Sequence, residues 1–278
     1  MSELRPVAPG VSLLRAPNAG LMTGSGTNTY LLGQRDVVVV DPGSADANFV
    51  ALILSVLRTW QARLAAVWLT HAHPDHAGNV GALCAATGAP LLAWHSPNQV
   101  YPVDDLPKPA RAAKHGDAIT VDDSSYQVLH TPGHASDHLC FYRSLDGLLL
   151  SGDLINQGNT VVIARPDGDM RQYLASLQLI RELSPIRILP GHGEPVEGAA
   201  LYVESYIRHR RMREAQLLDV LGEEWLSPYD CLARLYPALG HGLGAVALQQ
   251  IDAHLALLHE DGVVRRDDVL GLYQRVSG

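Results

Sequence analysis

The sequence predicts an α/β fold in which sheets are covered by helices over residues 1–198, followed by a small winged-helix-like domain over residues 199–278. In the first part, short apolar runs bounded by turn residues alternate with segments of helical spacing, which is typical of helix-covered sheets. From residue 198 onward, helical patterns dominate and a short β-like ribbon closes the chain. The length of 278 residues suits one large domain and one small domain.

Turn and capping residues define the elements of the first part. The apolar run at residues 37–40 ends at Asp41, Pro42 and Gly43, which indicates a strand stopped by a turn. Asp46 suits the N-cap of a helix whose apolar residues keep helical spacing as far as Trp60. Further strands are expected at residues 65–70, 90–94, 126–130, 138–143, 147–152 and 186–189, further helices at 79–87 and 169–183, and a Pro-rich loop at 97–109.

The second part predicts three helices and a ribbon. One long helix spans residues 199–221, a short one follows Ser227 and Pro228 as far as Leu235, and a third spans residues 244–260. The segment 263–268 has a β-like pattern. This order is typical of a winged-helix-like module.

Charge argues against nucleic acid as a partner. The formal net charge is −8, and the chain has two lysines, Lys108 and Lys114. Winged helices often read DNA through one helix, but the candidate helix at 245–259 contains Asp252 and no Lys or Arg. We therefore expect no DNA partner, and we interpret this module as a lid, a substrate wall or the surface of a homodimer. The basic cluster at 208–213 is interpreted as a solvated helix face or an inter-domain seam.

The chain shows no sign of a membrane or secretory segment. Its N-terminus lacks a basic region followed by an apolar stretch, and no apolar run approaches the length of a membrane span. The three cysteines, Cys84, Cys140 and Cys231, are odd in number and widely separated, which suits free thiols in a reducing compartment. We expect a cytoplasmic protein with no membrane contact.

A histidine-rich stretch, THAHPDHAGN at residues 70–79, follows an apolar run. It contains His71, His73, Asp75 and His76. Alternation at the end of a strand turns the first two imidazoles the same way, and Pro74 stiffens the loop that follows. Imidazole and carboxylate suit zinc and similar divalent ions. Taken alone, the stretch could also be a solvated polar turn.

Three more segments place a potential ligand directly after an apolar run and beside glycine. These ligands are His134, Asp153 and His192. Because glycine permits close backbone approach and open sheets carry their sites on loops beyond strand ends, we expect these loops to converge. Seven ligands are too many for one tetrahedral ion and fit two ions that share a carboxylate and a hydroxide.

The ordered set His-x-His-x-Asp-His, His134, Asp153 and His192 resembles that of the metallo-β-lactamase superfamily. Within it, the chain is most similar to the β-lactamase-like protein 2 (LACTB2-like) branch, a metallohydrolase domain with a C-terminal winged helix. Stretches at residues 28–32, 130–138 and 206–214 support this resemblance. It implies a four-layer αββα sandwich with two divalent metal ions at one edge, and Zn²⁺ is the metal that it favours.

By matching position, the resemblance implies that His71, His73 and His134 hold one metal ion. Asp75, His76 and His192 would hold the second, with Asp153 bridging the two. Asp41 stands where the family has a carboxylate that orients a ligand. Asp75 and Asp153 are the expected catalytic residues, since Asp75 could orient the hydroxide or pass a proton to the leaving group.

The resemblance implies a dinuclear hydrolase that uses a metal-bridging hydroxide to cleave an ester, thioester or similar bond. A small-molecule or carrier-bound acyl substrate is favoured over RNA by the acidic charge. The alternative is an endoribonuclease that acts on single-stranded RNA. A β-lactamase, a sulfur dioxygenase and a DNA-binding regulator with a vestigial metal site are less favoured.

The remaining histidines are not expected to be ligands. His138 could support a ligand from behind or be purely structural. We expect surface or loop positions for His95, His115, His241, His254 and His259.

Overall fold

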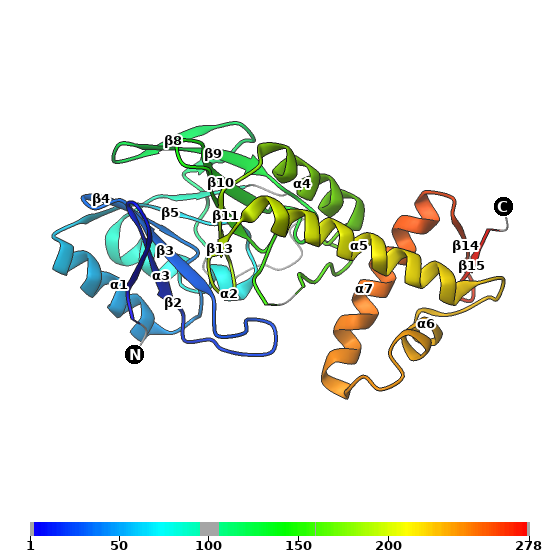
Figure 1. Ribbon diagram of the computed structural model, residues 1–278. Helices are drawn as coiled ribbons and strands as arrows, with labels where there is room; N and C mark the ends of the chain where they lie inside the picture. The colour runs from blue at the N-terminus through cyan, green and yellow to red at the C-terminus, as the bar shows by residue number, and fades with distance from the viewer. Residues whose placement is uncertain (1–2, 95–105, 159, 277–278) are drawn as a thin grey trace.

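The computed structural model describes residues 3–94, 106–158 and 160–276 (Figure 1). Most of the Pro-rich loop predicted at 97–109, together with His95, lies outside these residues. The described part of the chain contains a seven-stranded sheet, a six-stranded sheet and a two-stranded ribbon.

The first sheet keeps its strands in sequence order. The first four strands pair antiparallel and the last four pair parallel. The strands are β1 (Arg5–Ala8), β2 (Val11–Arg15), β3 (Asn28–Leu32), β4 (Asp36–Val40), β5 (Arg63–Trp68), β6 (Leu91–Ala93) and β7 (Arg111–Ala112).

The second sheet runs in the order β13-β12-β11-β10-β9-β8. Strands β11 and β12 pair parallel and the others antiparallel. The strands are β8 (Ala118–Val121), β9 (Ser124–His130), β10 (Leu139–Arg143), β11 (Leu148–Gly152), β12 (Arg187–Pro190) and β13 (Val196–Glu197).

Helices cover the outer face of each sheet, so the predicted α/β, four-layer αββα sandwich is confirmed. Helices α1 (Ala47–Trp60) and α3 (Val80–Thr87) share a core with the first sheet. Helices α4 (Met170–Leu183) and α5 (Ala199–Leu221) share another with the second. A third core fills the space between the two sheets.

Strand alternation explains these layers. In β4, Val37 and Val39 pack toward α1, whereas Val38 and Val40 pack between the sheets. All four are buried, as expected for a strand with both faces covered. Trp68 of β5 crosses the inner layer to reach Phe141 of β10, with ring centroids 4.9 Å apart.

Most predicted element boundaries are confirmed within a few residues, with two corrections near the site. Strand β5 ends at Trp68, two residues before the predicted end. Residues 74–77 form a short helix, α2 (Pro74–Ala77), where we expected a loop. Pro74 occupies the first turn, where its missing N–H has no helical partner to lose.

The C-terminal segment contains α6 (Pro228–Leu235), α7 (His241–Glu260), β14 (Val264–Asp267) and β15 (Leu272–Arg275). Ser227 and Asp230 form a capping box at the start of α6. Helix α7 begins three residues before the predicted start. Figure 1 shows α5 extending away from the sandwich, with α6, α7 and the ribbon gathered around its far end.

This segment has a core of its own, and α5 and α7 connect it to the sandwich. The far half of α5 packs with α6, α7 and the ribbon, while its first half belongs to the core on the second sheet. Ala253 and Leu257 of α7 also enter that core. The winged-helix character of the segment and a domain boundary at residue 198 stay predictions. Among the described residues, no helix is long and apolar enough to cross a membrane.

Candidate metal centre

The seven predicted ligands converge at one edge of the sandwich. His71 and His73 follow β5, and Asp75 and His76 lie on α2. His134 follows β9, Asp153 follows β11, and His192 follows β12. Because each of these strands delivers its next loop to the same edge, residues separated by up to 121 positions in the chain meet there.

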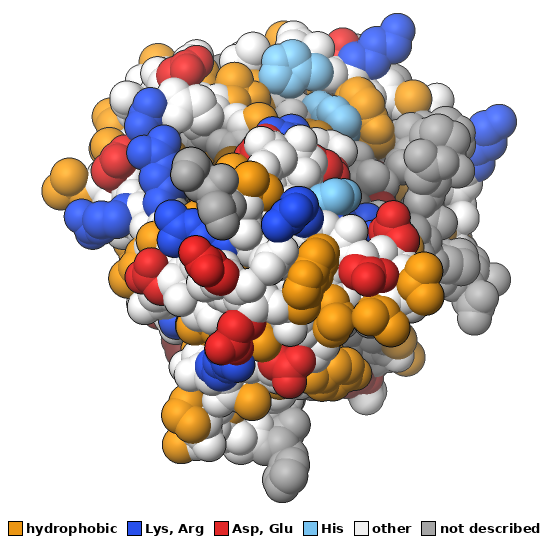
Figure 2. All heavy atoms as spheres, turned by 90° about the vertical axis from the view of Figure 1, so that its right-hand side faces the viewer, with side chains coloured by type: hydrophobic (Ala, Val, Ile, Leu, Met, Phe, Trp, Pro, Cys, Tyr) orange, Lys and Arg blue, Asp and Glu red, His pale blue; other side chains and the backbone are white. Residues whose placement is uncertain are grey.

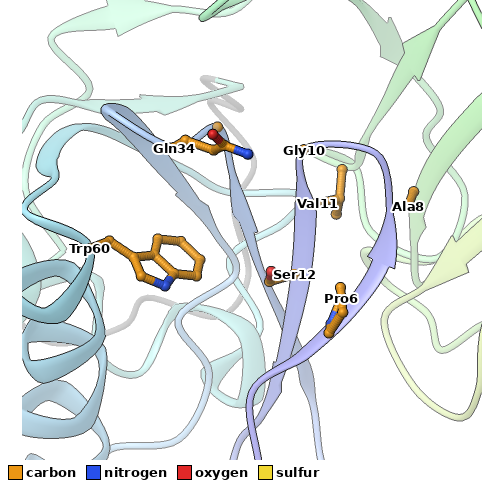
Figure 3. A pocket seen from close by; sticks show the side chains of 8 residues that line it. Pro6, Ala8, Gly10, Val11, Ser12, Gln34 and Trp60 are labelled. Carbon is orange, nitrogen blue, oxygen red and sulfur yellow. The ribbon is translucent and has the colours of Figure 1, made fainter.

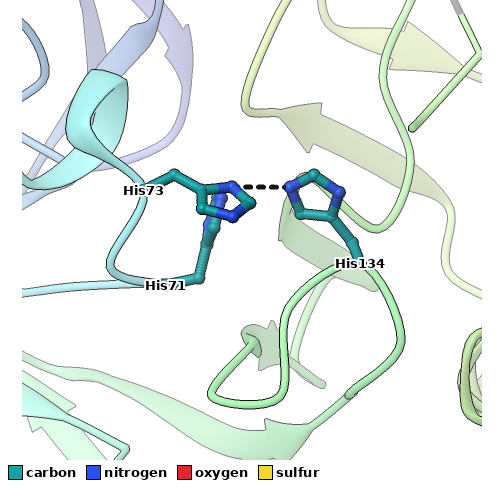
Figure 4. Close-up of side chains that lie close together, drawn as sticks. All are labelled: His71, His73 and His134. Atoms are coloured by element: carbon teal, nitrogen blue, oxygen red, sulfur yellow. Dashed lines mark hydrogen bonds between the residues drawn. The ribbon is translucent and has the colours of Figure 1, made fainter. Parts of the chain in front are cut away.

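The first group of donors contains His71, His73 and His134 (Figure 4). One nitrogen from each ring lies within 4.8 Å of the others. Nδ1 of His73 and Nε2 of His134 are 2.9 Å apart. The rings of His71 and His73 meet edge to face, since both leave the extended segment that precedes α2.

The second group contains Asp75, His76 and His192, with donor atoms again within 4.8 Å of one another. Nε2 of His192 lies 3.2 Å from Oδ2 of Asp75 and 3.3 Å from Nε2 of His76. The first turn of α2 brings Asp75 and His76 to this point together.

Asp153 lies between the two groups. Its Oδ1 atom is 3.4 Å from Nε2 of His76 and 3.4 Å from Nε2 of His192. Its Oδ2 atom is 3.7 Å from Nε2 of His134, in the other group. The two oxygens of one buried carboxylate therefore face different donor sets.

Asp41 fixes the second group from behind, in the position predicted for it. Its Oδ2 atom lies 2.9 Å from Nδ1 of His76 and accepts a hydrogen bond from the Thr70 hydroxyl at 2.7 Å. The Thr70 backbone N–H donates to Oδ1 at 2.7 Å. This arrangement orients His76 so that Nε2 faces Asp153.

His138 supports the site through the backbone. Its buried Nε2 atom accepts a hydrogen bond from the Asp153 N–H at 3.0 Å, and its Nδ1 atom lies 2.9 Å from the Thr131 hydroxyl. His138 therefore lies behind the donor groups and holds the backbone of Asp153. The sequence alone does not decide this position, because neither contact has a sequence motif.

Two supporting residues were missed by sequence reasoning. Asn156 accepts a hydrogen bond from the His192 N–H at 3.0 Å through its side chain, and the Tyr206 hydroxyl of α5 donates to the Asn156 carbonyl. The Val162 carbonyl lies 2.6 Å from Nδ1 of His134. A polar residue shortly after Asp153 is only a weak sequence signal for the role of Asn156. The contact of the Val162 carbonyl has no sequence signal, because every residue has a backbone carbonyl.

Charges within the site balance by pairing. Burial acts to lower the pKa of His192, but the carboxylates of Asp153 and Asp75 outweigh it and raise this pKa to about 9. Burial acts to raise the pKa of Asp75, but His76 and His192 lower it to about 2. In the other group, burial and the neighbouring imidazoles lower the pKa of His73 to about 3, so that ring is neutral at pH 7.

These residues fit divalent metal ions. Neutral imidazole nitrogens and ionised carboxylates are the donors that zinc and related ions take. The buried atoms Nε2 of His71 and Oδ1 of Asp153 have no hydrogen-bond partner among the described residues, although both face the other donors. Buried polar atoms without partners are costly, and a cation between the groups would satisfy them.

A cavity of about 540 Å³ opens onto the donors. His73, Asp75, His134, Asp153 and His192 line it. Its other walls are formed by Met22, Thr23, Pro74, Asn156, Thr160, Val161, Val162, Ala164 and Gln249. Gln249 belongs to α7, so the C-terminal segment contributes to the wall of the site.

A second cavity, of about 390 Å³, lies beside the β1–β2 turn (Figure 3). Trp60, Gln34 and Ser12 line it together with small residues of β1 and β2. None of its described lining residues is ionisable. Hydrolytic chemistry therefore belongs to the cavity at the donors.

The sandwich and the two donor groups at its edge define a class of protein, the metal-dependent hydrolases. Comparison with known proteins identifies the family. Residues 22–192 match the model of the metallo-beta-lactamase superfamily. The chain is 30% identical to the beta-lactamase-like protein 2 homolog of Drosophila melanogaster, over 94% of this chain and 92% of that protein.

Two further matches extend the comparison. The chain is 30% identical to the atrochrysone carboxyl ACP thioesterase of Passalora fulva, over 95% of this chain and 80% of that protein. A beta-lactamase domain protein from Burkholderia ambifaria has the same fold, with a TM-score of 0.88, 23% identity and coverage of 99% of this chain and 94% of that chain.

The chain belongs to the metallo-β-lactamase superfamily, and it is a metal-dependent hydrolase related to β-lactamase-like protein 2 and to fungal thioesterase-like proteins.

Proposed function

We propose that the protein is a dinuclear, zinc-dependent hydrolase that cleaves an ester or thioester bond of a small-molecule or carrier-bound acyl substrate. The observation that carries this proposal is the position of Asp153, whose two oxygens face two separate donor groups. A single ion would use one group and leave the other set of buried imidazoles and carboxylates without a role.

The proposed ligand sets are those expected from the sequence. His71, His73 and His134 would hold one ion, and Asp75, His76 and His192 the other, with Asp153 shared. Two such ions, when bound, would lower the pKa of water to about 7 and polarise the scissile carbonyl. Asp75 lines the cavity and is ionised, so its carboxylate can hold the attacking group by hydrogen bonding and receive a proton.

Two features support an acyl substrate. Part of the cavity wall is apolar, with Met22, Val161, Val162 and Ala164, which suits a hydrocarbon body. One relative is named as a thioesterase that acts on an acyl carrier protein substrate. Figure 2 shows the C-terminal end of the molecule, where acidic, basic and apolar side chains are interspersed. The formal net charge of −8 makes a polyanion such as RNA less favoured.

Metal analysis and a substrate panel test the proposal. The purified protein should contain about two ions per chain, with zinc giving the highest turnover after reconstitution. It should hydrolyse acyl-thioesters faster than labelled single-stranded RNA or nitrocefin. Asp153→Asn should lower turnover at least about a hundredfold and release part of the metal.

His259→Ala, on the exposed end of α7, serves as a control for loss of a histidine. One ion per chain at full activity would reject the dinuclear mechanism. Preferential cleavage of RNA would reject the acyl substrate and support the endoribonuclease instead.

A further inference from the structure

A third cavity, of about 270 Å³, lies between α5, α6 and α7. Helix α5 contributes His209, Arg210, Arg213 and Leu217, and α7 contributes Gln250 and His254. The remaining lining residues are Thr160, Leu235, Tyr236, Leu239, Leu243, Val246, Ala247 and Ile251. Thr160 also lines the cavity at the metal centre, so the two cavities are neighbours.

The polar side of this cavity is cationic. Arg210 is 2% exposed, and its guanidinium lies over the ring of Tyr173. Arg213 lies over the ring of Tyr236, one turn further along α5. No Asp or Glu occurs among the described residues that line the cavity. Two guanidinium groups therefore line a cavity whose described lining residues provide no carboxylate, which favours an anion.

Three side chains that line this cavity carry buried hydrogen-bonding atoms without partners among the described residues. The atoms are Nε of Arg210, Nε2 of Gln250 and both ring nitrogens of His254. Arg210 uses its other nitrogens to bind the Gln250 side-chain oxygen and the Val161 carbonyl, and these bonds fix its position. The first two groups are donors only, and a neutral His254 adds a third N–H.

His254 was expected on the surface, and that expectation is wrong. It is 3% exposed and lies on the inner side of α7. Burial, followed by the charges of Arg210, His209 and Arg213, lowers the pKa of His254 to about 3, so the ring is neutral at pH 7. Unpaired donors on the side chains of a cavity wall favour an acceptor, and an anionic oxygen meets the donors and the two guanidinium charges together.

The rest of the lining is largely apolar. Leu235, Leu239, Leu243, Val246 and Ile251 come from α6, α7 and the segment between them. They provide a surface for a hydrocarbon body but no hydrogen-bonding side chain. A ligand that fits both sides has one anionic head and an apolar body.

We propose that the cavity between α5, α6 and α7 binds an amphiphilic carboxylate, with its head among Arg210, Arg213, Gln250 and His254 and its hydrocarbon body against the leucine-rich wall. The site is separate from the metal centre and does not depend on the reaction proposed there. It is coupled in space to that centre, because Arg210 binds the Val161 carbonyl, one residue from the Val162 carbonyl that contacts His134.

Calorimetric titration of the metal-loaded 278-residue chain with decanoate tests the proposal. Decanoate should bind at one site. Decanamide, which has the same body without the charge, should bind about tenfold more weakly, and inorganic phosphate should not compete. Arg213→Gln and His254→Leu should each weaken decanoate binding about tenfold or more. Arg211→Gln removes the same charge from an exposed position of α5 outside the cavity and should leave affinity unchanged.

Several outcomes would overturn the proposal. Absence of decanoate binding would mean that the cavity holds only water. Equal binding of decanamide would remove the role of the charge. If Arg213→Gln binds decanoate with the same affinity as the unchanged chain, decanoate binds at another place, for example at the metal centre. If His254→Leu fails to fold, the comparison of Arg213→Gln with Arg211→Gln decides the question.

Discussion

Nδ1 of His76 lies 2.9 Å from Oδ2 of Asp41, and both side chains are almost completely buried. The same carboxylate accepts the backbone N–H and the hydroxyl of Thr70, which leaves it no freedom to rotate. Asp41 thus sets the orientation of an imidazole whose other nitrogen faces Asp75 and Asp153.

Asp41→Asn should weaken metal binding by about 10–100-fold, because the ring of His76 loses the acceptor that orients it and raises its basicity. Competitive titration against a chromogenic chelator measures the affinity. Asp36→Asn, at an exposed carboxylate at the start of β4, is the control. Unchanged affinity for both ions in Asp41→Asn would show that His76 is held by its packing alone.

Gly191→Ala should displace the side chains of the metal centre, whereas Gly→Ala at a glycine far from the centre should not. A Cβ at Gly191 would collide with the Asp153 carboxylate and lie 2.9 Å from Cε1 of His76. We expect turnover to fall at least about tenfold, since a displaced ligand loses its productive geometry. Gly244→Ala is the matched control: its Cβ meets open space on α7, where alanine should stabilise the helix by about 1 kcal/mol. Full activity of Gly191→Ala would contradict this geometry.

The metal-free chain should lose stability as the pH rises from 6.5 to about 9. The carboxylates of Asp153 and Asp75 overcome burial to raise the folded-state pKa of His192 from 6.5 to about 9. A histidine with a raised pKa stabilises the fold fully below its unfolded pKa, and this contribution is lost as the pH passes the folded value. His76, whose pKa is raised in the same way, acts in the same direction.

Thermal unfolding of chelator-treated protein across this range measures the effect. Metal-loaded protein should show a smaller slope, because bound cations replace the protons that pair with the carboxylates. His192→Ala should reduce the slope of the metal-free chain. A melting temperature that rises between pH 6.5 and 9 in the metal-free chain would have the wrong sign.

Gln249→Trp should raise KM for a bulky acyl substrate about tenfold while kcat for a small ester stays nearly constant. Gln249 lies on α7, is exposed and lines the cavity at the metal centre, so a larger side chain occupies substrate space without touching the proposed ligands. Gln172→Trp, at an exposed position of α4, controls for the added indole. Equal KM values in the two variants would exclude α7 as a substrate wall.

Local sequence determined the fold class and the identity of the donors. Asp46 caps the start of α1 and the left-handed Gly88 ends α3, both where the sequence indicated, because these signals act within a few residues. The alternation of β4 assigns its valines to two cores for the same reason. Histidines and aspartates that follow apolar runs were recognisable as donors, since residue type and strand context are both written in the sequence.

Only the tertiary structure decided how these parts meet. Asp153 faces both donor groups because β11 ends where the loop after β5 of the other sheet meets the loops after β9 and β12 of its own sheet. No local pattern encodes that distance. The short helix α2 was missed because its four residues have no apolar period, and Pro74 was read as part of a loop. The Val162 carbonyl at His134 has no side-chain signature, and the burial of His254 depends on α5 packing against α7. Contacts of this kind join residues far apart in the chain, and packing of the whole molecule sets them.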